Sequence, residues 1–125
     1  MNNTLKEYLS YFFILSNEIE ILLNEFEHEW GEDEDPPYIF LFSKVGKVIA
    51  NNISYCDDKE RLEIFSHIES GINSGDEYLS TAVATGLIEA LVNTSDGNPE
   101  LWDRIEDYLG TESKKYALAW KNFGQ

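Results

Sequence analysis

A chain of 125 residues has the usual size of one domain, and its 42% hydrophobic content is enough to form a core, which excludes a disordered chain. The net charge of −15, from 24 acidic and 9 basic residues, excludes direct binding to nucleic acid or to anionic membranes, because like charges repel. The single cysteine excludes an intramolecular disulfide, and no apolar run approaches the roughly 20 residues of a membrane span. We therefore expect a cytoplasmic, folded protein.

The first predicted helix lies between Leu5 and Trp30, where apolar residues recur at three- and four-residue spacing. Ser16 and Asn17 interrupt this pattern, and because their side chains compete for backbone hydrogen bonds, the interruption either bends the helix or splits it in two. A glycine and the stretch EDEDPP then end it. The next predicted helix covers residues 38–53, whose apolar spacing is helical although their β-branched content weakly favours a strand.

Two further helices are predicted in the middle of the chain. The third begins after Asp57, which forms a capping-box pattern with Glu60, and ends at Gly71. The fourth, over residues 76–92, is apolar or small around most of its circumference. This composition places it at the centre of the fold, where Gly86 allows a neighbouring helix to approach closely.

The last two predicted helices follow directly. The fifth begins with Asn98 as its cap and Pro99 at its first position, and it closes at Gly110. The sixth covers residues 111–123 and is expected to bury Tyr116, Ala119, Trp120 and Phe123.

The connections between these helices are short, which favours antiparallel neighbours. The expected fold is all-α, a single helical domain over residues 1–125. We expect about six helices arranged as stacked antiparallel hairpins, either as an irregular bundle or as a short HEAT-like α-solenoid.

The sequence lacks the motifs of catalysis and of metal binding. His28 and His67 have no zinc-site spacing and are expected to be ordinary solvated residues. Cys56 precedes Asp57 and Asp58, whose charges disfavour a reactive thiolate. There is no nucleophile elbow, phosphate-binding glycine loop or calcium loop. We therefore expect no enzymatic activity, no cofactor, no metal and no small-molecule ligand.

A dense acidic segment, residues 25–35, ends the first predicted helix and enters the following loop. Residues 1–35 contain ten acids and one lysine, and seven of these acids fall within the acidic segment: Glu25, Glu27, Glu29, Glu32, Asp33, Glu34 and Asp35. One interpretation is a solvated helix end and loop that keeps the protein soluble. The other is a docking site for a basic protein, because a dense patch of one charge accelerates association.

Two aromatic residues, Trp30 and Tyr38, lie within and beside the acidic segment. Each either anchors an interface with the partner or belongs to the core, because both fit helical stripes. Together with the seven acids they form the candidate partner-binding site.

Much of the chain after the acidic segment resembles the small helical immunity proteins that accompany polymorphic or contact-dependent growth-inhibition toxins of bacteria. The resemblance covers most of residues 37–124, from PYIFLF to LGTESKKYALAWKNFG. Its first distinctive part is an Ile-Glu pair (Ile68, Glu69) before a Gly-Asp turn (Gly75, Asp76), and its second is the helix over residues 83–91. The third is the C-terminal pattern K-Y-x-x-x-W-x-x-F, formed by Lys115, Tyr116, Trp120 and Phe123.

The resemblance implies a cytosolic, non-enzymatic inhibitor that binds its cognate toxin C-terminal domain and blocks it. The acidic segment leads us to expect a basic toxin domain, with a nuclease as the candidate, because a nuclease presents cations to phosphates. The alternative is a helical adaptor or scaffold module that binds a peptide or helix in a groove between helices.

Overall fold

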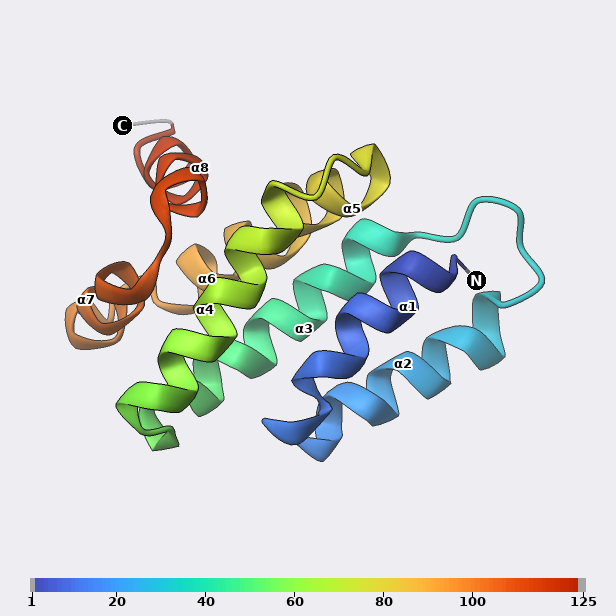
Figure 1. Ribbon diagram of the computed structural model, residues 1–125, viewed down its shortest axis with the longest axis horizontal. Coiled ribbons are helices and arrows are strands. Elements are labelled where there is room, and N and C mark those ends of the chain that lie inside the picture. The colour runs from blue at the N-terminus through green and yellow to red at the C-terminus, as the bar shows by residue number, and fades with distance from the viewer. Residues whose placement is uncertain (1, 124–125) are drawn as a thin grey trace.

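The computed structural model describes residues 2–123, and these residues form helices joined by short connections (Figure 1). No strand occurs among them, which confirms the predicted all-α class. Met1, Gly124 and Gln125 lie outside the described residues, and Gly124 is the last position of the segment that resembles immunity proteins.

An antiparallel hairpin forms the N-terminal part of the fold. Helix α1 (Asn3–Ser10) continues into the short 3₁₀ helix η1 (Tyr11–Ile14), and α2 (Asn17–Trp30) returns beside α1 (Figure 1). The side chain of Asn2 accepts hydrogen bonds at the start of α1, and Ser16 caps α2. Because Ser16 has an extended backbone, the interruption splits the predicted first helix in two.

A loop over residues 31–37 connects α2 to the next helices. These are α3 (Tyr38–Asn52), the 3₁₀ helix η2 (Ile53–Tyr55) and α4 (Asp58–Ile72). The predicted capping box is confirmed at the start of α4. Asp57 Oδ1 accepts from the backbone N–H of Glu60 at 2.8 Å, and Glu60 Oε1 accepts from that of Asp57 at 3.0 Å. Helix α4 ends one residue beyond its predicted end.

The predicted fourth helix is continuous, but its hydrogen-bonding pattern changes along its length; we call it the central helix (residues 77–94). Helix α5 (Glu77–Thr81) passes into η3, a π-helix (Ala82–Ile88), and then into α6 (Glu89–Thr94). All but one of the seven π-helix residues are buried, which confirms the central position. A Cβ atom on Gly86 would lie 2.7 Å from the carbonyl oxygen of Ile39 in α3, so only glycine permits this helix contact.

The chain ends in α7 (Pro99–Tyr108) and α8 (Thr111–Lys121). The side chain of Asn98 accepts a hydrogen bond from the backbone N–H of Leu101, and Pro99 is the first helical residue, as predicted. These two helices lie at the opposite end of the molecule from the α2–α3 loop (Figure 1).

The predicted buried face of α8 is wrong. Its buried residues are Ser113 and Ala117, whereas Tyr116 is 50% exposed, Phe123 is 77% exposed and Ala119 is also exposed. The indole of Trp120 is partly buried, donates a hydrogen bond to Asn93 at 2.9 Å and stacks on Phe123. Trp120 and Phe123 therefore contact each other at the surface.

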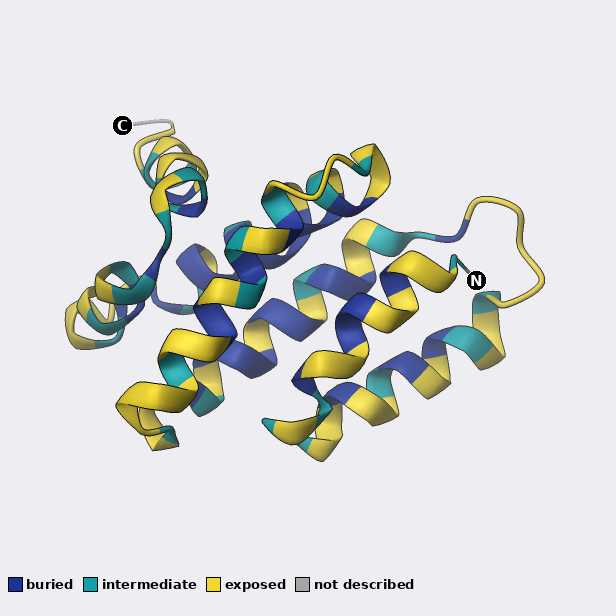
Figure 2. Ribbon diagram, viewed as in Figure 1, coloured by how far each residue is buried: buried dark blue, intermediate teal, exposed yellow. Residues whose placement is uncertain are grey.

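One hydrophobic cluster extends through the fold from Leu5 in α1 to Ala117 in α8. Successive helices reverse direction from α1 through α2, α3 and α4 to the central helix, so their inner faces share this core (Figures 1 and 2). Within residues 2–123, no helix is both long enough and apolar enough to cross a membrane.

Candidate functional site

The acidic segment occupies the last turns of α2 and the loop that leads to α3. Helix α2 buries Ile19, Leu23 and Phe26, so the acids between these positions face outward. The loop after α2 is largely exposed (Figure 2). Glu27 is half-buried, whereas the other acids of the segment form a row of exposed carboxylates: Glu25, Glu29, Glu32, Asp33, Glu34 and Asp35.

Very little of this negative charge is neutralised by the protein itself. Lys6 Nζ lies 3.0 Å from Glu27 Oε1, and within the described residues this is the only ion pair of the acidic segment. Asp33 Oδ1 accepts the backbone N–H of Asp35 at 2.9 Å, which fixes the turn of the loop. The six exposed carboxylates therefore carry their charge at the surface without an ion pair to any base among residues 2–123.

Trp30 and Tyr38 both pack against the hydrophobic core and are partly buried, which agrees with the interpretation that they belong to the core. The phenol oxygen of Tyr38 accepts the backbone N–H of Asn2 at 3.1 Å, and its ring lies 5.9 Å from that of Phe26. Tyr38 thus joins the start of α3 to both α1 and α2, beside the acidic segment.

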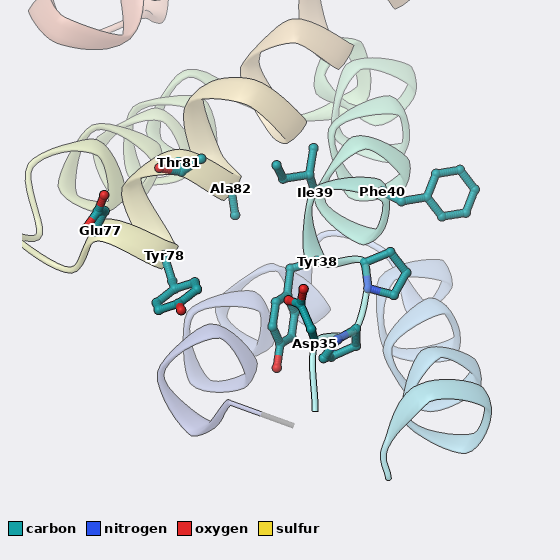
Figure 3. A pocket seen from close by; sticks show the side chains of 10 residues that line it. Asp35, Tyr38, Ile39, Phe40, Glu77, Tyr78, Thr81 and Ala82 are labelled. Atoms are coloured by element: carbon teal, nitrogen blue, oxygen red, sulfur yellow. The ribbon is translucent and has the colours of Figure 1, made fainter. Parts of the chain in front are cut away.

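A groove of 530 Å³ lies next to the acidic segment, between the start of α3 and α5 (Figure 3). Tyr38 and Ile39 line one side, and Tyr78, Thr81 and Ala82 line the other. Tyr78 is 69% exposed and Ile39 is 43% exposed, so the groove presents apolar surface to solvent. Sequence reasoning did not find it, because about forty residues separate its two sides and only the packing of the central helix against α3 brings them together.

The charges that line the groove are all negative. Asp35, the last residue of the acidic segment, lies at one side, and Glu77 lies at the other. Lys44 is not a lining residue, but its Nζ lies 4.4 Å from the ring centroid of the lining residue Phe40, whose side chain points away from Tyr78 (Figure 3). The groove is therefore apolar with an acidic border.

His67 was expected to be an ordinary solvated residue, and this prediction is wrong. Its ring lies between Tyr8 and Tyr11, with centroid distances of 4.2 and 4.1 Å, and Nε2 lies 2.9 Å from the carbonyl oxygen of Tyr8. Burial lowers the pKa of His67, and the hydrogen bond to Tyr8 opposes this change. His67 therefore connects α4 to the N-terminal hairpin, whereas His28 is exposed as predicted.

Cys56 behaves as the sequence indicates, although the main cause differs. Burial, followed by the carboxylates of Glu60 and Asp57, raises the pKa of Cys56, while Arg61 opposes the change. The thiol lies 3.6 Å from the carbonyl oxygen of Asn52. Within residues 2–123, no group of three or more His, Cys, Asp or Glu residues is placed to hold a metal ion.

These features define a small all-α protein in which an exposed acidic surface lies beside an apolar groove. A family model described as a domain of unknown function, DUF7674, matches residues 12–124, and the chain belongs to this family. The matched range includes the acidic segment and both sides of the groove, whereas α1 lies outside it. Comparisons with curated proteins and with solved structures gave no match.

Proposed function

We propose that this chain is an immunity protein that binds a cognate bacterial toxin domain in the cytoplasm and neutralises it through its acidic surface. The observation that carries the proposal is the row of six exposed carboxylates, which have no ion pair with the described bases of the chain. The resemblance of residues 37–124 to small helical immunity proteins supports the same function.

The physical basis of the docking is electrostatic. A dense patch of one sign attracts an oppositely charged protein over about one screening length, roughly 8 Å at physiological salt, and can raise the association rate tenfold or more. A nuclease is the candidate toxin, because it must present Lys or Arg side chains to phosphates. Carboxylates that occupy this surface would exclude the nucleic acid by taking its place.

The proposal predicts a toxin gene beside the gene of this chain, and co-expression of the two genes tests it. Cells that carry both genes should grow, and the two proteins should purify as a complex. Growth arrest despite a folded, expressed chain would end the proposal.

Charge reversal tests the role assigned to the acidic segment. Glu32→Lys combined with Glu34→Lys should lower the association rate by about tenfold or more, because both exposed carboxylates face the incoming partner. Asp103→Lys combined with Asp107→Lys makes the same change in net charge on exposed positions of α7, at the far end of the molecule. Equal effects of the two pairs would show that net charge, and not this surface, governs the association.

The groove between α3 and α5 favours a second candidate, a helical adaptor that binds a peptide or helix. Its exposed Tyr78 and Ile39 are of the type that anchors peptide segments. The dependence of binding on salt separates the two functions. An acidic docking site loses association rate as ionic strength rises, whereas an apolar groove alone does not.

A further inference from the structure

We propose that the groove between α3 and α5 receives a large apolar side chain of the partner protein, with a Lys or Arg beside it in the partner's sequence. This inference rests on the proposed function and identifies the part of the partner that enters the groove. The acidic segment would then guide the partner to the surface, and the groove would hold it there.

The shape and lining of the groove suit an apolar anchor. Its volume of 530 Å³ is within the range of about 300–1,000 Å³ that ligand pockets occupy in proteins. The rings of Tyr38 and Tyr78 stand on opposite sides, and the side chains of Ile39 and Ala82 lie above the two rings in the view of Figure 3. An aliphatic or aromatic side chain placed between two tyrosines would bury apolar surface on both of its faces, as the central residues of protein interfaces do.

Charge decides which apolar segment fits. Asp35 and Glu77 are the charged residues that line the groove, they lie on opposite sides, and neither takes part in an ion pair with another described residue. A Lys or Arg next to the anchor would meet one of these carboxylates, whereas an acidic neighbour would be repelled by both. The rest of the acidic segment extends from Asp35 and would attract further bases of the partner.

The residues on both sides of the groove that would contact the anchor, Tyr38 and Ile39 in α3 and Tyr78 and Thr81 in α5, belong to helices. Ala82 is both part of its lining and the first residue of the π-helix, a structure that is rare and frequent at functional sites. The close contact of Gly86 with α3 fixes this π-helix against the opposite side of the groove. Binding therefore requires little reorganisation, which favours affinity.

Titration of the ¹⁵N-labelled full chain with synthetic peptides tests the inference. The first peptide is an amphipathic helix with leucines on one face and lysines on the other. The second has glutamates in place of the lysines, and the third has serines in place of the leucines. The first peptide should shift the backbone amide signals of residues 38–40 and 77–82, and the other two should leave these signals unchanged.

Two substitutions at one position separate the groove from general attraction to an acidic protein. Thr81 is exposed and lines the groove, so Thr81→Trp fills it without a change of charge, and Thr81→Ala keeps it open. Thr81→Trp should weaken the binding of the first peptide by about tenfold, which corresponds to about 1.4 kcal/mol of binding free energy. Thr81→Ala and the matched control Thr111→Trp, at an exposed position of α8, should bind as the original chain does.

Three outcomes would overturn the inference: shifts confined to other residues, equal binding of the glutamate peptide, or unchanged binding by Thr81→Trp. These outcomes leave the proposed function standing if the chain still protects cells against the toxin. Conversely, failure to protect cells, with the lysine peptide still bound in the groove, would reject the immunity function and retain the groove as a binding site for basic, apolar segments.

Discussion

Glu69 acts as a cap for a helix other than its own. Its carboxylate accepts the backbone N–H groups of Glu112 and Ser113, each at 2.9 Å, and the Ser113 hydroxyl at 2.6 Å. Helix α8 needs this cap because Gly110, which precedes it, has no side chain to accept a hydrogen bond. A Cβ at Gly110 would lie 2.5 Å from the Glu69 carboxylate, so the cap and the glycine depend on each other.

We predict that Glu69→Ala lowers the free energy of unfolding by about 1–3 kcal/mol, because it leaves two backbone donors and a buried hydroxyl without an acceptor. Partial burial raises the pKa of Glu69, but the hydrogen bonds from Ser113 and its neighbours hold it below its ordinary value of 4.5. The stabilisation is therefore fully present above pH 4.5 and is lost as the pH falls through the lowered pKa. Urea unfolding of both forms at neutral and acidic pH measures this, with Glu63→Ala, at an exposed position of α4, as the control.

His67 should make the stability of the fold depend on pH near neutrality. The carbonyl oxygen of Tyr8 can only accept a hydrogen bond, so Nε2 of His67 must carry the proton that it donates. A neutral imidazole can supply this proton, so the hydrogen bond does not require the charged form of His67. Burial holds the pKa of His67 below its value of 6.5 in the unfolded chain, so the unfolded state binds more protons as the pH falls below 6.5. The free energy of unfolding should therefore decrease from about pH 7.5 to about pH 5.5.

His67→Phe provides the comparison, because it keeps an aromatic ring between Tyr8 and Tyr11 but cannot be protonated. Its stability should change less over the same pH range, as measured by urea unfolding. A variant with the pH dependence of the original chain would assign the effect to another group.

At the scale of the element, sequence patterns predict best where the signal is local. The cap of α4 depends on Asp57 and Glu60, three residues apart, and the start of α7 depends on adjacent Asn98 and Pro99. The face of α8 was predicted wrongly, because its orientation depends on the distant Glu69. The acidic segment could be found from the sequence, whereas the groove could not, since it exists only where the continuous helix formed by α5, η3 and α6 packs against α3.

At Gly86 the central helix approaches α3 so closely that there is no room for a side chain. A Cβ there would lie 2.7 Å from the carbonyl oxygen of Ile39 and 2.8 Å from Cβ of Phe42. We predict that Gly86→Ala lowers the free energy of unfolding by about 1–3 kcal/mol, because α3 and the π-helix must move apart. Thr85→Ala, at an exposed position of the same π-helix, should have little effect, and equal losses in the two variants would contradict the close contact.

At the scale of the whole molecule, the net charge of −15 should make the free protein less stable in low salt. The six exposed carboxylates of the acidic segment repel one another, and the screening length falls from about 30 Å at 0.01 M salt to about 8 Å at 0.15 M. We predict that sodium chloride raises the urea midpoint over this range. A variant that combines Glu32→Gln, Asp33→Asn and Glu34→Gln should be more stable in low salt and respond less to added salt.

This response has the opposite sign to that of partner binding. Salt that screens the repulsion within the acidic segment also screens its attraction to a basic toxin domain, so the fold should become more stable while the association slows. Both quantities depend on the same carboxylates, and the triple variant should weaken both responses together. A salt response of stability that is unchanged in the triple variant would place the repulsion on other acids of the chain. In that case, the charge-reversal pair on α7 serves as the reference that assigns the loss of association rate in salt to one surface or the other.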